Sequence, residues 1–228
     1  MRPEIQVVQD EILAAALPHV AFDGWSDTTL SAAIAETGHD PALARTAFPR
    51  GAVDLALAYH RQGDALMRAR LAATDLSDMR FRDRIAAAVR FRLEAVEDRE
   101  LVRRGSTLFS LPQYTGDGAR AIWGTADAIW TALGDTSKDV NWYTKRATLS
   151  AVYGATVLFW LGDDSPDFAN TWAFLDRRID NVMQFEKLKA KTRDNPLLKP
   201  LAGLMDKVRA PSGVKRGDLP GHFTKGNF

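Results

Sequence analysis

Helical periodicity is the feature of this 228-residue chain that most constrains its fold. Apolar residues recur every three or four positions, and no segment alternates apolar and polar residues as a half-buried strand does. Cap and turn residues separate the periodic segments. Ser26 or Asp27 can cap a helix that Gly38 ends, and Asp40-Pro41 is typical of the start of the next helix. The sequence therefore predicts an all-α protein.

Proline and cap residues also suggest where individual helices begin and end. The first helix is expected to end near Pro18, because proline cannot donate a backbone hydrogen bond. Later helices are expected to begin at Pro112 and at the Ser-Pro-Asp segment 165–167. The predicted helices cover about residues 5–16, 26–34, 41–48, 53–71, 85–96, 101–109, 112–133, 139–160 and 165–185, and a further amphipathic segment lies at 196–208.

The sequence contains no group of residues typical of a catalytic, cofactor or metal site. It has no cysteine, and its four histidines are scattered without ligand spacing. No glycine-rich phosphate loop, triad order or paired-carboxylate motif stands out. The acidic run of Asp163, Asp164 and Asp167 is explained by helix capping without a metal. We therefore expect no enzymatic activity, no cofactor and no metal.

Charge changes along the chain. Residues 1–60 contain three Lys or Arg and eight Asp or Glu, a net charge of −5, whereas residues 187–228 carry a net charge of +7. No apolar run approaches the roughly 18–20 residues of a membrane span, and the charged N-terminal segment is not typical of a signal peptide. The basic C-terminal segment contains one apolar stripe that fits either a docked helix or a membrane-surface helix. Its residues are Leu197, Leu201, Leu204, Met205 and Val208.

The segment 139–160 is predicted to be a helix that is apolar on more than one side. Asp139 can cap it, and Trp142 and Tyr143 are adjacent, about 100° apart on a helix, so one face cannot bury both well. Arg146 follows one turn after Trp142. Exposed Trp, Tyr and Arg are enriched in interface hot spots, so Trp142, Tyr143 and Arg146 are predicted to bind a partner. The alternative is that the aromatic residues belong to the core.

Other apolar residues of this helix and of the preceding one fit either a core or the wall of a ligand cavity. Core is the simpler interpretation for any one of them, but a lipid pocket in a helical protein must be lined by residues of this kind. The candidate lipid-binding residues are Trp123, Trp130, Val152, Leu158 and Phe159.

Residues 5–60 resemble the TetR regulator family. The resemblance lies in three short predicted helices before a long one, with G-W-S-D-T-T-L at 24–30 and I-A-E-T-G at 34–38. It implies a helix-turn-helix head followed by a helical ligand-binding and dimerisation domain. DNA binding needs cations at phosphates, but this segment has a net charge of −5, and the would-be reading helix 41–47 offers only Arg45. We expect no nucleic-acid partner.

A second resemblance covers residues 5–210. N-W-Y-T-K-R at 141–146, D-S-P-D-F at 164–168 and T-W-A-F-L at 171–175 resemble the accessory lipid-binding family of ubiquinone (coenzyme Q) biosynthesis, known from mitochondria and alphaproteobacteria. The resemblance implies a TetR-like fold without DNA binding, a homodimer, a cavity for isoprenoid lipids and a C-terminal membrane helix. It also implies a partner, the di-iron hydroxylase that acts on demethoxyubiquinone, and places Trp142 and Tyr143 on the surface for it.

The resulting hypothesis is a lipid-binding accessory protein of ubiquinone biosynthesis. It would bind a polyprenylated quinone intermediate and present it to the hydroxylase, in the cytoplasm and peripherally on the inner face of the membrane. The alternatives are a TetR-type regulator with a hydrophobic effector and a helical interaction protein without a ligand. The expected organisation is a three-helix head at 1–50, a lipid-binding and dimerisation domain at 51–190, a membrane helix at 196–210 and a disordered tail at 211–228.

Overall fold

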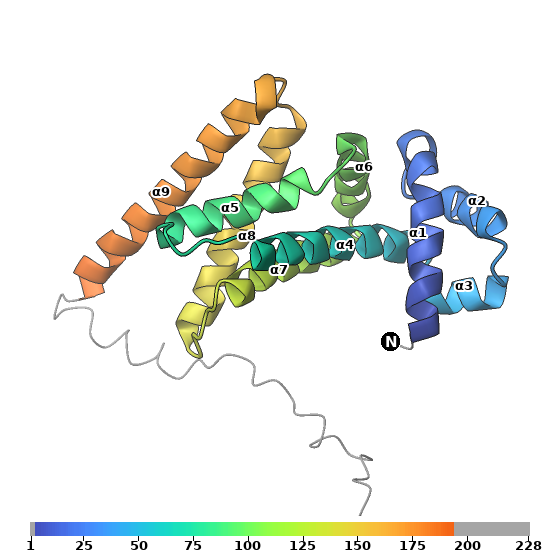
Figure 1. The fold of residues 1–228 in the computed structure, drawn as a ribbon, viewed down its shortest axis with the longest axis horizontal. Helices are drawn as coiled ribbons and strands as arrows, with labels where there is room; N and C mark the ends of the chain where they lie inside the picture. Colours follow the sequence, from blue (N-terminus) through green and yellow to red (C-terminus); the bar gives the residue numbers. More distant parts are fainter. Residues whose placement is uncertain (1–2, 194–228) are drawn as a thin grey trace, which may run out of the picture.

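The computed structural model describes residues 3–193, with side chains from 4 to 182. Figure 1 shows a small head, made of α1 to α3, at one end of the molecule, and a larger body, made of α5 to α9, at the other. The described residues contain helices and no strand, which confirms the all-α prediction. The predicted membrane stripe, Leu197, Leu201, Leu204, Met205 and Val208, and the predicted tail lie outside the described residues.

The helices follow one another with short connections. Their bounds are α1 Pro3–Asp23, α2 Asp27–Thr37, α3 Pro41–Ala47, α4 Ala52–Ala73, α5 Phe81–Glu94, α6 Arg99–Ser110, α7 Thr115–Ala132, α8 Val140–Leu161, the 3₁₀ turn η1 Pro166–Phe168 and α9 Ala169–Arg193. No helix within the described part of the chain is long and apolar enough to cross a membrane.

The caps predicted for the second and third helices are confirmed. The Ser26 side chain accepts a hydrogen bond from the Thr29 backbone N–H, and Asp40 accepts two from the start of α3. Gly38 ends α2 with φ +67°, a left-handed conformation that glycine adopts without steric cost. These local signals fix both ends of α2 and the start of α3.

Two separate cores hold the head and the body. The head core is built on Ile12, Ala16, Val20, Ala33, Phe48 and Leu55, all almost fully buried. The body core is built on Met67, Val89, Ile129, Leu149, Trp160, Leu175 and Ile179. The helix α4 contributes to both cores and runs from the head into the body (Figure 1). The Trp25 indole N–H also donates to the Leu101 carbonyl oxygen at 2.9 Å, which ties the head to α6.

The prediction that the first helix ends near Pro18 is wrong, since α1 continues to Asp23 with Pro18 inside it. Because Pro18 has no backbone N–H, the carbonyl oxygen of Ala14, one turn earlier, loses its helical hydrogen bond. Both residues lie on the exposed side of α1, where water can bind that oxygen. Val20, just beyond the proline, is fully buried in the head core. Burial of the last turn therefore offsets the lost hydrogen bond.

Two predicted helix starts differ from the structure. Pro112 lies in a turn, and α7 begins at Thr115. The segment 165–167 forms the turn η1, and the helix proper starts at Ala169. Asp163, in addition to Ser165, caps the backbone between α8 and α9. Its carboxylate accepts hydrogen bonds from the backbone N–H groups of Ser165 at 2.9 Å and Thr171 at 2.8 Å. The Thr171 hydroxyl also donates to this carboxylate, at 2.6 Å. That hydrogen bond, together with those from Ser165 and the Thr171 backbone N–H, holds the pKa of Asp163 at about 2.

Candidate functional site: an apolar cavity and an aromatic patch

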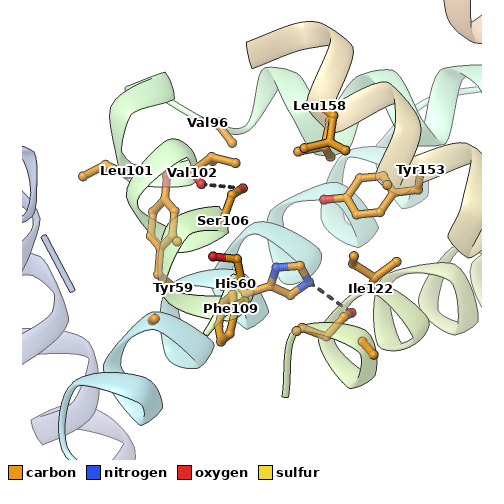
Figure 2. A pocket seen from close by; sticks show the side chains of 18 of the residues that line it. Tyr59, His60, Val96, Leu101, Val102, Ser106, Phe109, Ile122, Tyr153 and Leu158 are labelled. Carbon is orange, nitrogen blue, oxygen red and sulfur yellow. Dashed lines mark hydrogen bonds between the residues drawn. The ribbon is translucent and has the colours of Figure 1, made fainter. Parts of the chain in front are cut away.

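A cavity of about 440 Å³ lies where the head and the body meet, since residues of both cores line it. This volume is within the usual ~300–1,000 Å³ range of small-molecule sites. Its walls come from α4, from the α5–α6 region, from α7 and from α8, and Trp25 of the head also lines it. Most of the lining is apolar: it includes Leu93, Val96, Leu101, Val102, Phe109, Ile122, Val157 and Leu158. Figure 2 shows several of them, among them Val96, Ile122 and Leu158, converging from different helices.

One wall of this cavity is polar. His60 on α4 lies against α7, with its Nε2 atom 3.1 Å from the Ala121 carbonyl oxygen and 2.8 Å from Thr125 Oγ1 (Figure 2). Behind it, Arg92 donates from Nε to Asp64 Oδ1 at 2.7 Å and from Nη2 to the His60 carbonyl oxygen at 3.1 Å. The side chains of Arg92 and Asp64 are 5% and 9% exposed, so the charges of this pair are buried together.

Burial keeps His60, Tyr59 and Tyr153 uncharged at neutral pH, beside the charged pair of Arg92 and Asp64. It lowers the pKa of His60 to about 4, and the positive charge of Arg92 acts in the same direction. Burial also raises the pKa of Tyr59 to about 12 and raises the pKa of Tyr153. The cavity therefore combines a large apolar surface with three neutral polar side chains and one buried, paired arginine. This combination suits a mostly apolar ligand with a small polar part.

Of the predicted lipid-binding residues, only Leu158 lines this cavity, with 68% of its surface exposed. Trp130 and Val152 are buried in the body core. Trp123 packs beside Trp142, with ring centroids 6.0 Å apart, and Phe159 stacks on Phe174 at 4.5 Å.

Beside Trp123 and Val152, the adjacent residues Ile122 and Tyr153 reach the cavity instead, because one position along a helix rotates a side chain by about 100°. Beside Phe159, the predicted Leu158 lines the cavity. Gly154 also lines the cavity, and its lack of a side chain leaves room there. The sequence signal that could have found this face is the set 153, 154, 157 and 158, which shares one side of α8.

The predicted partner residues lie at the start of α8. The Asp139 cap is confirmed, since its side chain accepts from the Asn141 backbone N–H. Trp142 and Tyr143 are both partly buried, with their rings in edge contact at 4.8 Å. Trp142 therefore lies in an aromatic patch, which we define as Trp123, Trp142 and Tyr143.

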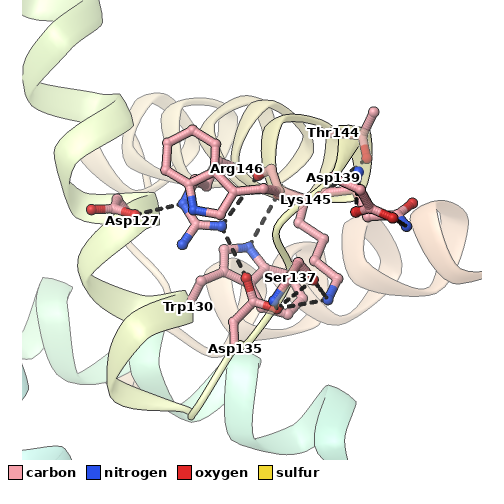
Figure 3. A network of polar contacts seen from close by, with 10 residues as sticks. Asp127, Trp130, Asp135, Ser137, Asp139, Thr144, Lys145 and Arg146 are labelled. Carbon is pink, nitrogen blue, oxygen red and sulfur yellow. Dashed lines mark hydrogen bonds and ion pairs between the residues drawn. The ribbon is translucent and has the colours of Figure 1, made fainter. Parts of the chain in front are cut away.

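Arg146 is almost fully buried rather than exposed. Its Nε donates to Asp127 at 2.5 Å and its Nη1 to Asp135 at 3.0 Å, while its Cζ lies 4.1 Å from the centre of the Trp142 ring (Figure 3). Lys145 also donates to Asp135, at 2.7 Å. Arg146 thus holds the loop before α8 against the α7 helix and supports Trp142 from below. Whether Trp142, Tyr143 and Arg146 take part in partner binding remains a prediction.

Burial alone would raise the pKa of Asp135. The hydrogen bonds from Lys145, Ser137 and Arg146 outweigh it and hold that pKa well below its usual range. Asp135 is therefore a carboxylate at neutral pH, fixed at the centre of this network. No group of three or more residues able to hold a metal ion occurs among the described residues.

Comparison with known proteins shows which proteins this chain is similar to. The COQ9 family model matches residues 115–186, which include the whole aromatic patch and the α7 and α8 walls of the cavity. The chain is 30% identical over 187 residues to the mitochondrial ubiquinone biosynthesis protein COQ9 of Rattus norvegicus, covering 77% of this chain and 59% of the rat protein. It is 29% identical over 188 residues to the probable mitochondrial COQ9 protein of Dictyostelium discoideum, covering 78% of this chain and 61% of that protein.

The chain thus spans about three-fifths of the length of these relatives. Among solved structures, a TetR transcriptional regulator from Nitrosomonas europaea superimposes with a TM-score of 0.60 at 19% identity, covering 76% of this chain and 97% of the regulator. This likeness confirms the TetR-like fold. The resemblance to the ubiquinone-biosynthesis family is confirmed as well: the chain carries a COQ9 domain at residues 115–186 and is a homologue of COQ9 proteins over most of its length.

Proposed function

We propose that this chain is a lipid-binding accessory protein of ubiquinone biosynthesis. It binds a polyprenylated quinone intermediate and presents it to the di-iron demethoxyubiquinone hydroxylase at the inner face of a membrane. The observation that carries the proposal is the apolar cavity of about 440 Å³ in a homologue of ubiquinone biosynthesis proteins. The chain itself supplies no catalytic step in this proposal.

The cavity addresses a physical problem. A polyprenyl tail is nearly insoluble in water, and a peripheral enzyme must reach a ring that is held in lipid. Each buried CH₂ group contributes about 0.8 kcal/mol, so an apolar cavity offsets much of the cost of moving the lipid out of the bilayer. Leu158, exposed and at the cavity wall, is placed where an entering tail would make contact.

The aromatic patch is the proposed contact for the hydroxylase. Trp142 and Tyr143 are only partly buried, and Arg146 supports Trp142 through a contact of 4.1 Å. Aromatic anchors that are held rigid in the free protein lose little entropy on binding. Arg146 acts in this proposal as a positioning residue, because its own side chain is buried.

The head, the homodimer and the C-terminal stripe complete the proposal. The head at 1–50 is a structural remnant of a DNA-binding unit, and its net charge of −5 opposes contact with a polyanionic duplex. Residues 51–190 bind the lipid and dimerise. The stripe at 196–210 attaches the protein to anionic membranes, and we expect Leu201→Asp with Leu204→Asp to abolish sedimentation with anionic liposomes while the dimer stays folded.

Native mass spectrometry of the purified protein tests the central claim. We expect a co-purifying isoprenoid lipid, and its loss when the cavity is filled by Gly154→Phe. The matched control is Gly124→Phe, at a helical glycine of α7 with open space around it. A protein that never carries an isoprenoid, even after incubation with a prenylated quinone, contradicts the proposal.

A second experiment tests the partner surface. We expect Trp142→Ala to weaken binding of the hydroxylase by roughly 2 kcal/mol or more, as for an interface hot spot, and to leave bound lipid unchanged. The control is Trp172→Ala, which removes a partly buried tryptophan far from the patch in sequence. Equal binding by Trp142→Ala and the wild type would remove the patch from the proposal.

A further inference from the structure

The polar wall of the cavity contains one nitrogen atom whose hydrogen-bonding character the structure determines. The Nε2 atom of His60 faces two oxygen atoms, the Ala121 carbonyl at 3.1 Å and Thr125 Oγ1 at 2.8 Å. A carbonyl oxygen can only accept. Thr125 donates its single hydroxyl proton to Asp64 Oδ1, also at 2.8 Å. Both neighbours of Nε2 therefore require that Nε2 carry a proton.

The other ring nitrogen is then a bare acceptor. His60 is neutral and has one ring proton, which Nε2 holds, so Nδ1 presents a lone pair. Nδ1 has no hydrogen-bond partner among the described residues. In Figure 2 the Nε2 edge of the His60 ring is turned to α7, and the opposite edge faces the space between Tyr59, Ser106 and Tyr153.

An unpaired acceptor in an apolar cavity discriminates between ligands. A hydroxyl group can donate to Nδ1 and takes over the hydrogen bond that a water molecule would otherwise make. A carbonyl or ether oxygen can only accept, so it would leave the lone pair of Nδ1 without a partner, which is unfavourable in a site with little water.

We propose that His60 Nδ1 accepts a hydrogen bond from a ring hydroxyl of the bound lipid, so that the cavity selects a phenol or hydroquinone ring over the corresponding quinone. This inference rests on the proposed lipid-binding function and names the chemical form of its ligand. The ring lies at the polar wall, and the prenyl tail follows the apolar lining toward Leu158. Tyr59, which lines the same cavity, can donate to a second ring oxygen.

Titration of the full chain with three probes tests this assignment. The probes are a geranyl-substituted hydroquinone, its dimethyl ether and the matching quinone, measured by calorimetry without oxygen. We expect the hydroquinone to bind roughly tenfold more tightly than the ether or the quinone, as expected for one neutral hydrogen bond and the cost of leaving it unmade.

The variant His60→Gln isolates the acceptor. A glutamine amide nitrogen can still donate toward Ala121, but no acceptor remains at the position of Nδ1. We expect the preference for the hydroquinone to disappear, because the ether no longer leaves an unpaired acceptor and the hydroquinone no longer gains a hydrogen bond. Binding of the ether that is at least as tight as in the wild type shows that the cavity is intact. The control His19→Gln changes a histidine that pairs with Glu36 on the head surface and should keep the preference.

A measurement on the wild type supports the same conclusion if the variant does not fold. The nitrogen NMR resonance of His60 Nδ1 should shift with the hydroquinone and not with the ether. Equal affinities of the wild type for hydroquinone and ether, or a preference that survives in His60→Gln, overturn the inference but leave lipid binding in place. A wild type that binds none of the three probes overturns the proposed function itself.

Discussion

Two buried arginines, one in each functional region, show how differently the same side chain is used in this molecule. Arg92, in the cavity wall, pairs with Asp64, and both side chains are withdrawn from water. Arg146, under the aromatic patch, pairs with Asp135, which is equally buried, and with Asp127, which is 45% exposed. Asp135 also has Lys145 as a second cationic partner. Asp64 has no second ion-pairing cation of that kind among the described residues, since His60 is neutral.

The comparison teaches that the cavity region depends on a single charge pair, whereas the patch region shares its charges over a network that reaches solvent. A buried carboxylate that loses its only cation is very unfavourable, while one that keeps a cation, or that water can reach, is much less so. The cavity wall should therefore be the more fragile of the two regions.

The largest expected effect comes from breaking the cavity pair. We expect Arg92→Met to lower the free energy of unfolding by about 3–5 kcal/mol, because Asp64 is left buried without a partner. The measurement is denaturation in urea. Adding Asp64→Leu to Arg92→Met should recover much of the loss, and a double variant as unstable as the single one would show that Arg92 acts through its packing alone.

The next effect appears with pH. His60 has a pKa of about 4 in the folded chain and an ordinary value of 6.5, so the unfolded chain binds a proton between these values that the folded chain does not. Stability should therefore fall as the pH decreases from about 6.5 to about 4, by up to about 3 kcal/mol. Besides burial, Arg92 and Arg61 lower this pKa, while Asp64 and the Ala121 carbonyl raise it.

Urea denaturation across this pH range measures the effect, and His60→Gln should flatten the dependence. The carboxylates of Asp135 and Asp163 have lowered pKa values, so their contribution to the free energy of unfolding is lost only at more acidic pH. They therefore do not mask the effect of His60 between about pH 4 and 6.5. An unchanged pH dependence in His60→Gln would mean that His60 does not titrate as the cavity wall requires.

Breaking the patch network should cost less. We expect Arg146→Met to destabilise the fold by about 2 kcal/mol, because Lys145 still neutralises Asp135 and water still reaches Asp127. Hydroxylase binding should weaken as Trp142 loses its support, with lipid binding unchanged. Lys145→Met serves as the control and should have the smaller effect on both stability and binding; the reverse order would place Lys145, not Arg146, at the centre of the network.

The smallest expected effect concerns the space beside Arg92. A Cβ atom at Gly63 would lie 2.5 Å from the Arg92 Cζ atom, which Asp64 and the His60 carbonyl hold in place. Gly63→Ala should therefore destabilise by about 1–2 kcal/mol despite the better helix propensity of alanine. At Gly124 nothing lies within 4 Å, and Gly124→Ala should stabilise by about 0.5–1 kcal/mol. Thermal denaturation of both variants sharpens the contrast between crowded and open helix positions.

Local sequence signals predicted much of the fold. The Ser26, Asp40 and Asp139 caps and the glycine at the end of α2 depend on hydrogen bonds and dihedral angles within a few residues, so the sequence alone contains what determines them. The continuation of α1 past Pro18 depends instead on burial of Val20 against distant parts of the chain.

The site was less predictable, for a geometric reason. Leu158 was predicted and lines the cavity, but aromatic size also drew attention to Trp123, whose smaller neighbour Ile122 lines the cavity in its place. The rotation of each helix relative to the others decides between such adjacent positions. His60, Asp64 and Arg92 were missed because their partners lie far apart in sequence. The only local signal was the i, i+4 spacing of His60 and Asp64, which many surface pairs share.

The participation of α4 in two cores has a consequence for how the molecule unfolds. Leu55 and Ala56 anchor one half of this helix in the head, and Met67 and Leu71 anchor the other half in the body. Neither core can open fully without fraying the same continuous run of backbone hydrogen bonds, so the two cores should melt as one cooperative unit. Native-state hydrogen exchange should then find the slowest amides near the middle of α4, where the two cores meet, with exchange there limited by global unfolding.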